Sequence, residues 1–105
     1  MVSPIVAGLD KKSDGNYEAV IVNYDSIGCR DEHGNFQVAG TGAQLLYGCC
    51  EAFYKENMEP EELVETISNC LLSALDRDSL SGWGAYVYLL TPTEMQVKAL
   101  KTRQD

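Results

Sequence analysis

Basic residues are scarce in this chain. Its 105 residues include 8 lysines and arginines against 16 aspartates and glutamates, which gives a net charge of −8 at pH 7. A chain with this balance is repelled by phosphate backbones and by anionic lipid surfaces. The charge therefore argues against nucleic acid as a partner.

Long hydrophobic runs are also absent. The longest apolar stretch, residues 85–90, has the length of a strand and falls far short of the roughly 20 residues that cross a membrane. The first ten residues lack the basic region that opens a signal peptide. We therefore expect no membrane association and no secretion.

Histidine is nearly missing, and the cysteines lack metal-binding spacing. The single histidine, His33, lies in a polar stretch beside Gly34, where a solvated turn residue is expected. Zinc sites need paired cysteines or histidines at short spacings, which this chain does not offer. We expect all the cysteines to be reduced thiols that act as small core residues in a cytosolic or nuclear protein: Cys29, Cys49, Cys50 and Cys70.

What the sequence does contain is a pattern of strands and helices that predicts an α+β fold. Residues 4–10, 17–24 and 36–39 read as strands, with a hairpin turn at residues 14–16. Two helices are expected next, one from Thr41 as its cap to about Tyr54, and one from Pro60 to about Asp76. Residues 85–90 and 95–99 then form a closing hairpin. Two helices cannot cover both faces of five strands, which indicates part of a larger fold or assembly.

Two segments could carry chemistry. Residues 40–43 (GTGA) lie between a strand and a helix, but Leu45 replaces the third glycine of a dinucleotide-binding turn, which favours a simple tight turn. Residues 76–84 (DRDSLSGWG) gather acids, hydroxyls and an arginine at the end of the second helix. No cysteine, histidine or serine elbow completes a catalytic set there, so a polar site and a hydrogen-bonded turn are both open.

This loop carries a resemblance to a known family. The pattern from Arg77 to Gly84 (RDxxSGxG), after a long amphipathic helix, resembles the signature of proteasome beta subunits, N-terminal nucleophile hydrolases with an αββα sandwich fold. Four other segments agree in order: residues 4–10 (PIVAGLD), 25–29 (DSIGC), 40–43 (GTGA) and 57–60 (NMEP). The ending, residues 100–105 (LKTRQD), is similar to the type-3 class of these subunits.

The resemblance implies a partial domain without catalysis. It covers the C-terminal half of the family's αββα sandwich, so residues 1–105 are expected to be a domain whose N-terminal half, with its threonine nucleophile, is absent. By position, Asp78, Ser81 and Thr41 match a polar framework around that threonine. Trp83 replaces a glycine common in catalytic members. The implied function is a non-catalytic structural subunit of the 20S core in protein degradation, bound to other alpha and beta subunits in the cytoplasm and nucleus.

The resemblance also implies a metal. The loop that matches Leu75, Asp78 and Ser81 can present backbone carbonyls to a hard cation such as magnesium, and a terminal aspartate like Asp105 can reach such a loop in a neighbouring subunit. Carbonyl and carboxylate oxygens are the ligands that hard cations prefer.

Two other functions stay open at this point. The chain could be a fragment of an active threonine-type endopeptidase, or an independent acidic interaction module that folds alone. Upstream coding sequence distinguishes the first alternative, and the folding of the chain on its own distinguishes the second.

Overall fold

Seven elements follow one another in the computed structural model, which describes residues 2–104. They are β1 (Ile5–Lys11), β2 (Tyr17–Tyr24), β3 (Arg30–Asp31), α1 (Ala43–Phe53), α2 (Pro60–Arg77), β4 (Ala85–Leu90) and β5 (Met95–Leu100). The order of three strands, two helices and two strands is the predicted one. The α+β expectation is thus confirmed at the level of a mixed helix and strand fold.

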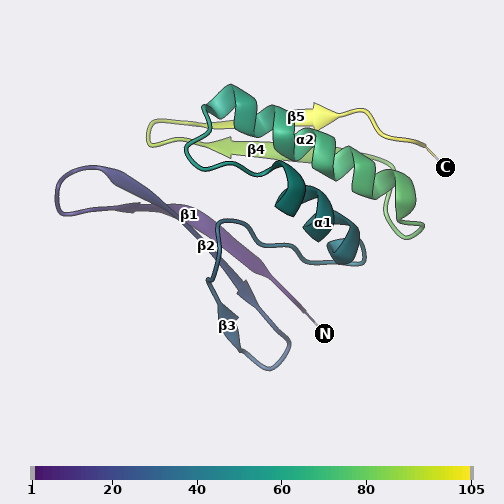
Figure 1. Cartoon of the computed structure of the whole chain (residues 1–105), viewed down its shortest axis with the longest axis horizontal. Helices are drawn as coiled ribbons and strands as arrows, with labels where there is room; N and C mark the ends of the chain where they lie inside the picture. The colour runs from purple at the N-terminus through teal and green to yellow at the C-terminus, as the bar shows by residue number, and fades with distance from the viewer. Residues whose placement is uncertain (1, 105) are drawn as a thin grey trace.

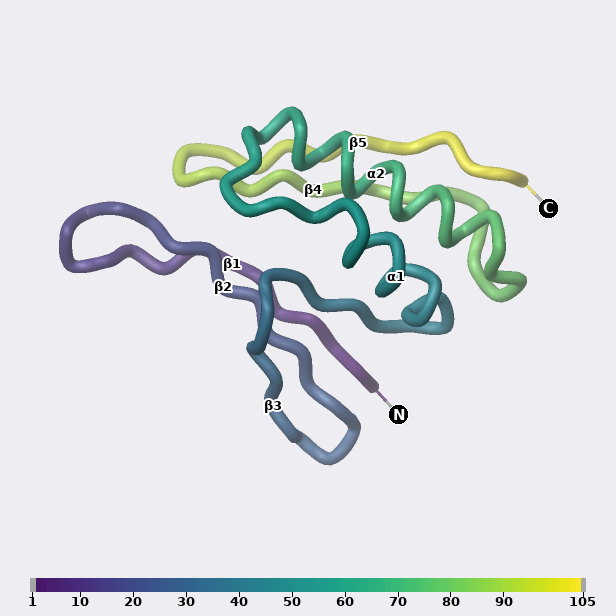
Figure 2. Tube along the Cα trace, in the orientation of Figure 1, coloured from purple at the N-terminus to yellow at the C-terminus, as the bar shows by residue number. Residues whose placement is uncertain are grey.

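The strands form two separate antiparallel sheets. One has the order β1-β2-β3 and the other is the β4-β5 hairpin. Figure 1 shows the two helices beside the β4-β5 hairpin, with the three-stranded sheet set apart from it across α1. The trace in Figure 2 shows the same division, since the chain leaves the first sheet after β3 and does not return to it.

The first hairpin is confirmed at the predicted turn. Gly15 has a φ of +87°, a left-handed conformation that costs glycine nothing. The backbone N–H of Asn16 donates to Oδ1 of Asp14 at 3.0 Å. This turn sets the register in which Leu9 faces Ala19 and Val6 faces Val22.

The predicted third strand at residues 36–39 is wrong. The strand instead comprises Arg30–Asp31, within the expected loop, and residues 36–39 are irregular. The ring of Phe36 packs edge-on against Tyr47 of α1, with centroids 5.6 Å apart. The side-chain amide of Asn23 donates to the carbonyl of Val38 at 3.3 Å. Side chains, rather than a backbone ladder, therefore hold this apolar segment.

The first helix begins without the predicted cap. Gly42 is the N-cap residue of α1 and no side chain caps this end, so the capping role expected for Thr41 is wrong. The hydroxyl of Thr41 is directed to another partner, described below. Phe53, expected on the buried face, is 60% exposed, whereas Cys50 is buried as predicted.

The second helix agrees closely with its start and stop signals. Pro60 occupies the first helical position, Glu61 and Glu62 lie at the positive end of the helix dipole, and the helix ends at Arg77. Cys70 and Ala74 are buried as expected, and so is Ser68. Of the other residues expected on that face, Leu63 is 39% and Ile67 is 38% exposed, so much of the apolar face of α2 is uncovered in this chain.

The expectation for the cysteines is confirmed in part. All the cysteines are free thiols, and Cys50 and Cys70 are buried between α1 and α2. Cys29 is exposed, because it lies in the tight loop after β2. It is therefore not a core residue.

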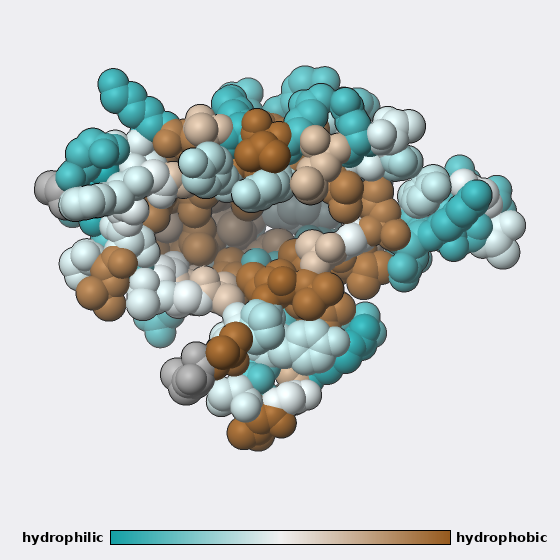
Figure 3. Space-filling view, turned by 180° about the vertical axis from the view of Figure 1, so that it is seen from behind, coloured by the Kyte–Doolittle hydropathy of each residue, from teal (hydrophilic) through white to brown (hydrophobic). Residues whose placement is uncertain are grey.

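The fold is open for its size. A folded monomer of this mass exposes about 5,800 Å² of surface, and this chain exposes 7915 Å². The radius of gyration is 14.6 Å, against about 13 Å for a compact domain of this length. Figure 3 shows where the excess arises, since apolar side chains surround a hollow between the upper and lower parts of the molecule.

Candidate functional site

A cluster of polar side chains forms where the loop after α2 meets the turn before α1. Asp78 ends α2 as its C-cap residue, Ser81 follows in the same loop, and Thr41 comes from the segment that enters α1. These are the three residues that the resemblance singled out. The structure brings all three within hydrogen-bonding distance.

The carboxylate of Asp78 is the centre of this cluster. Its Oδ2 accepts a hydrogen bond from the hydroxyl of Thr41 at 2.6 Å and another from the hydroxyl of Ser81 at 2.7 Å. Its Oδ1 accepts the backbone N–H of Leu80 at 3.2 Å. Asp78 is buried, so each of these bonds replaces a water that the carboxylate gives up on folding.

The absence of a side chain at Gly42 lets the two segments approach. A Cβ atom at this position would lie 3.1 Å from Oδ2 of Asp78, closer than ordinary van der Waals contact. The glycine that begins α1 therefore leaves room for the carboxylate. A larger residue there would crowd this carboxylate, whereas the φ of −93° at this position is open to any residue.

Hydrogen bonding lowers the pKa of Asp78 below its ordinary value. The hydroxyl of Thr41 contributes most, followed by the hydroxyl of Ser81 and the N–H of Leu80. These donors stabilise the charged carboxylate more than the neutral acid. A carboxylate with a lowered pKa is a weak base, so it is poorly suited to take a proton from Thr41 near neutral pH.

The backbone carbonyls of the same loop face the side chain of Arg103. The guanidinium donates from one nitrogen to the carbonyl of Leu75, and from the other to the carbonyls of Asp78 and Ser81, each at 2.8 Å. Sequence reasoning missed Arg103. No sequence signal marks this contact, because the acceptors are backbone carbonyls 22 to 28 positions earlier in the chain.

These three carbonyls are the ones predicted to hold magnesium. Their oxygens suit a hard cation, but Arg103 engages all of them in the described arrangement, so magnesium fits only if that side chain withdraws. Asp105, the fourth predicted ligand, lies outside the described residues. Within residues 2–104, no three or more of the histidine, cysteine and acidic side chains group in a way that could hold a metal ion.

Of the other candidates, His33 and Trp83 do not join this cluster, whereas residues 40–43 contribute Thr41 and Gly42 to it. His33 is exposed, and its backbone N–H donates to Oδ1 of Asp31 in a local turn. Residues 40–43 make a tight turn in which the N–H of Ala43 donates to the carbonyl of Gly40 at 3.2 Å. Trp83 has a left-handed φ of +63°, and its side chain is 79% exposed to solvent.

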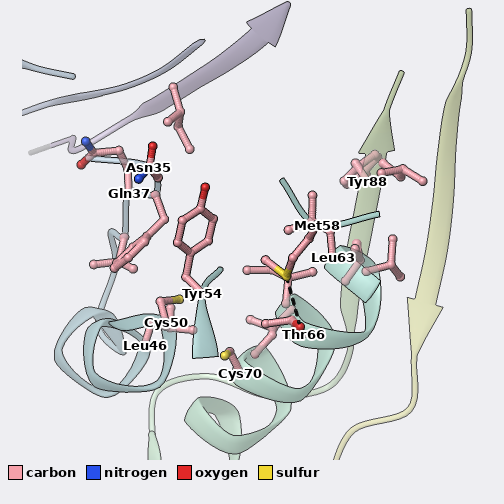
Figure 4. A pocket seen from close by; sticks show the side chains of 18 of the residues that line it. Asn35, Gln37, Leu46, Cys50, Tyr54, Met58, Leu63, Thr66, Cys70 and Tyr88 are labelled. Carbon is pink, nitrogen blue, oxygen red and sulfur yellow. Dashed lines mark hydrogen bonds between the residues drawn. The ribbon is translucent and has the colours of Figure 1, made fainter. Parts of the chain in front are cut away.

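A separate apolar cavity of about 460 Å³ lies between the helices and the sheets. Figure 4 shows its lining, with the sulfurs of Cys50 and Cys70 at its floor and a hydrogen bond from the Thr66 hydroxyl to the Met58 sulfur. Burial, the largest cause, raises the pKa of Cys70 to about 12. This thiol is therefore protonated and unreactive near neutral pH, and the cavity lacks a nucleophile at that position.

No helix within residues 2–104 has the length and apolarity needed to cross a bilayer.

Comparison with known proteins identifies the family. The family model for proteasome subunits matches residues 1–90. The chain is 50% identical to proteasome subunit beta type-3 of Saccharomyces cerevisiae over 104 residues, which cover 99% of the chain and 49% of that protein. It is 49% identical to subunit beta type-3-A of Arabidopsis thaliana over 100% of the chain and 50% of that protein. Against subunit beta type-3 of Drosophila melanogaster it is 45% identical, over 99% of the chain and 49% of that protein.

The chain thus spans about half the length of the relatives it matches, and almost all of its own length takes part in the match. The resemblance seen in the sequence is thereby confirmed, and the chain belongs to the proteasome subunit family.

Proposed function

We propose that this chain contributes to a non-catalytic structural beta subunit of the 20S proteasome core, and so to proteasomal protein degradation. The observation that carries the proposal is the 45 to 50% identity to beta type-3 subunits over nearly the whole chain. Its partners would be other alpha and beta subunits of the ring, in the cytoplasm and nucleus. The acidic net charge is consistent with partners other than nucleic acid.

Residues 1–105 would form the C-terminal half of an αββα sandwich. The excess of about 2,000 Å² in exposed surface supports this, because it leaves an apolar face on each layer for further elements to cover. The β4-β5 hairpin illustrates the point. By register, one face of this hairpin carries five large apolar side chains that are each between 46% and 64% exposed: Tyr86, Tyr88, Leu90, Met95 and Val97.

The chemistry of the polar cluster supports a structural role over a catalytic one. The hydroxyl of Thr41 donates a hydrogen bond to a carboxylate whose pKa is lowered, and the nearby Arg103 guanidinium has no acceptor for a proton. The lowered pKa of Asp78 makes its carboxylate a poor base toward Thr41. Asp78, Ser81 and Thr41 therefore serve as a framework that joins α1 to the loop after α2.

Magnesium stays a prediction for the assembled protein. The carbonyls of Leu75, Asp78 and Ser81 are the oxygen type that the ion prefers once Arg103 has withdrawn from them. Asp105 of this chain would reach such a loop in a neighbouring subunit. The ion would link subunits rather than take part in a reaction.

Co-sedimentation tests the proposed function. The chain, tagged and expressed in its native cells, is expected to co-sediment with a 20S particle that contains other proteasome subunits. Fluorogenic peptides would be cleaved at the same rate by particles carrying Thr41→Ala and by unaltered particles of equal abundance. A loss of one peptidase activity with intact assembly would instead favour the alternative, a fragment of an active threonine peptidase. A chain that sediments alone as a cooperatively folding monomer would favour an independent interaction module.

A further inference from the structure

The guanidinium of Arg103 occupies the centre of a ring of backbone oxygens. Its two terminal nitrogens donate to the carbonyls of Leu75, Asp78 and Ser81. Arg103 belongs to the segment after β5, whereas the three carbonyls belong to the end of α2 and the loop that follows it. The contact therefore joins segments that are 22 to 28 positions apart in sequence.

The oxygens are positioned for a cation by the end of the helix. Leu75 lies in the last turn of α2 and Asp78 is its C-cap residue, so these carbonyls have few partners within the helix. They also lie at the negative end of the helix dipole, where a positive charge is stabilised. The N–H of Asp78 donates back to the carbonyl of Leu75, and the N–H of Ser81 to the carbonyl of Asp78, which fixes the loop that presents them.

The planar shape of guanidinium suits this arrangement. Its N–H donors point outward in one plane from two separate nitrogens, so one side chain can reach three carbonyls. Lysine has a single nitrogen and cannot place its donors in this planar pattern. Arg103 is only partly exposed, which limits competition from water. The positive charge also lies close enough to Asp78 to contribute to the lowered pKa of its carboxylate.

We propose that the loop from Leu75 to Ser81 is a cation site whose resident cation is the side chain of Arg103, and that a metal ion enters only when this side chain leaves the carbonyls. Arg103 is then a positioning residue. It fixes the backbone from which the carboxylate of Asp78 and the hydroxyl of Ser81 extend toward Thr41, and it fastens the C-terminal segment to α2. This inference uses contacts within one chain and does not depend on the proposed function.

Terbium luminescence can test the exchange of one cation for another. Tb³⁺ is a hard cation that prefers oxygen ligands, and it emits when an excited tryptophan lies close by. The chain has one tryptophan, Trp83, two positions after Ser81, so excitation at a wavelength that only tryptophan absorbs reports on this loop.

Arg103→Ala is expected to give saturable Tb³⁺ emission with an apparent affinity at least tenfold higher than the unaltered full chain. The matched control is Lys101→Ala, which removes the same charge from an exposed position in the same segment and should behave as the unaltered chain does. Equal emission from the unaltered chain and from Arg103→Ala would overturn the proposal. So would an absence of emission from Arg103→Ala with an unchanged circular dichroism spectrum.

A second measurement needs no variant. In the unaltered protein, the Nη protons of Arg103 should exchange with solvent at least tenfold more slowly than those of Arg77, which is exposed. Equal exchange at the two arginines would show that the guanidinium is not held by the carbonyls, and would overturn the proposal even if Arg103→Ala failed to fold.

Discussion

The hydroxyl of Thr41 lies 2.6 Å from Oδ2 of Asp78, although the two residues are 37 positions apart in sequence. This bond joins the N-terminal end of α1 to the C-terminal end of α2. The two helices also each contribute a buried thiol, Cys50 from α1 and Cys70 from α2. The polar bond and the apolar contact together fix the angle between the helices, and each can be tested separately.

Thr41→Val should make the stability of the folded protein less dependent on pH. A lowered pKa in the folded state gives stability that is present above the ordinary value of about 3.9 and is lost as the pH falls through the lowered value. Since Thr41 is the largest cause of the lowered pKa of Asp78, its removal should reduce stability at pH 7 more than at pH 3. Urea unfolding at both pH values, in buffer with sucrose to favour the folded chain, measures the difference. Thr41→Ser, which keeps the hydroxyl, is the control, and an equal loss at both pH values would contradict the prediction.

Gly42→Ala and Gly48→Ala should have opposite effects on stability. A Cβ at Gly42 would lie 3.1 Å from Oδ2 of Asp78, which two hydroxyl groups hold in place, so crowding should cost about 1 to 3 kcal/mol. At Gly48, within α1, an added Cβ meets no atom within 4 Å outside its own helix. Alanine there should stabilise the helix by about 0.8 kcal/mol. Thermal unfolding of both variants checks the prediction, and a destabilised Gly48→Ala would contradict it.

Thiol reagents should distinguish the cysteines of the folded protein. Cys29 is exposed, whereas Cys70 is 1% exposed and has a pKa raised to about 12. Because the thiolate is the reactive form, Cys29 should react at least a hundredfold faster than Cys70 at pH 8. Mass spectrometry after brief labelling measures the order of modification. Similar rates in the folded protein, with both equally fast in urea, would show that the core between α1 and α2 opens readily.

The sequence predicted the elements better than the contacts between them. β2 has the predicted bounds and α2 begins at the predicted proline, because hydrophobic periodicity and capping are local signals. The segment at residues 36–39 was mistaken for a strand, because its apolar residues pack by side chains against α1. Local sequence cannot distinguish those two uses of apolar residues.

The polar cluster was found only in part for a similar reason. Thr41 had the residue type and position of a helix cap, and only the distant carboxylate of Asp78 redirects its hydroxyl. Arg103 was not found from the sequence, since its three acceptors are backbone carbonyls, which every residue has and no sequence pattern marks. Gly42 shows the same limit, because its requirement for space comes from a residue 36 positions later.

Charge on the open face of the β4-β5 hairpin should weaken both the self-association of the isolated chain and its incorporation into the assembled protein. Val97 is 54% exposed and lies opposite Tyr88, on the face that also carries Tyr86, Leu90 and Met95. Large apolar patches of this kind promote association. Val97→Lys should therefore reduce self-association of the isolated chain, as measured by analytical ultracentrifugation. Incorporation into a 20S particle should fall at least tenfold, because our proposed function requires this face to be buried there.

The matched control for this face is Gln96→Lys. It adds the same charge to the neighbouring position, which faces Leu89 on the other side of the hairpin. Gln96 is already polar and exposed, so this variant should leave both self-association and incorporation close to those of the unaltered chain. If Val97→Lys entered the particle as efficiently as Gln96→Lys, the apolar face would be open in the assembly as well. The hairpin would then be an outer surface, and the proposed half-sandwich arrangement would be wrong.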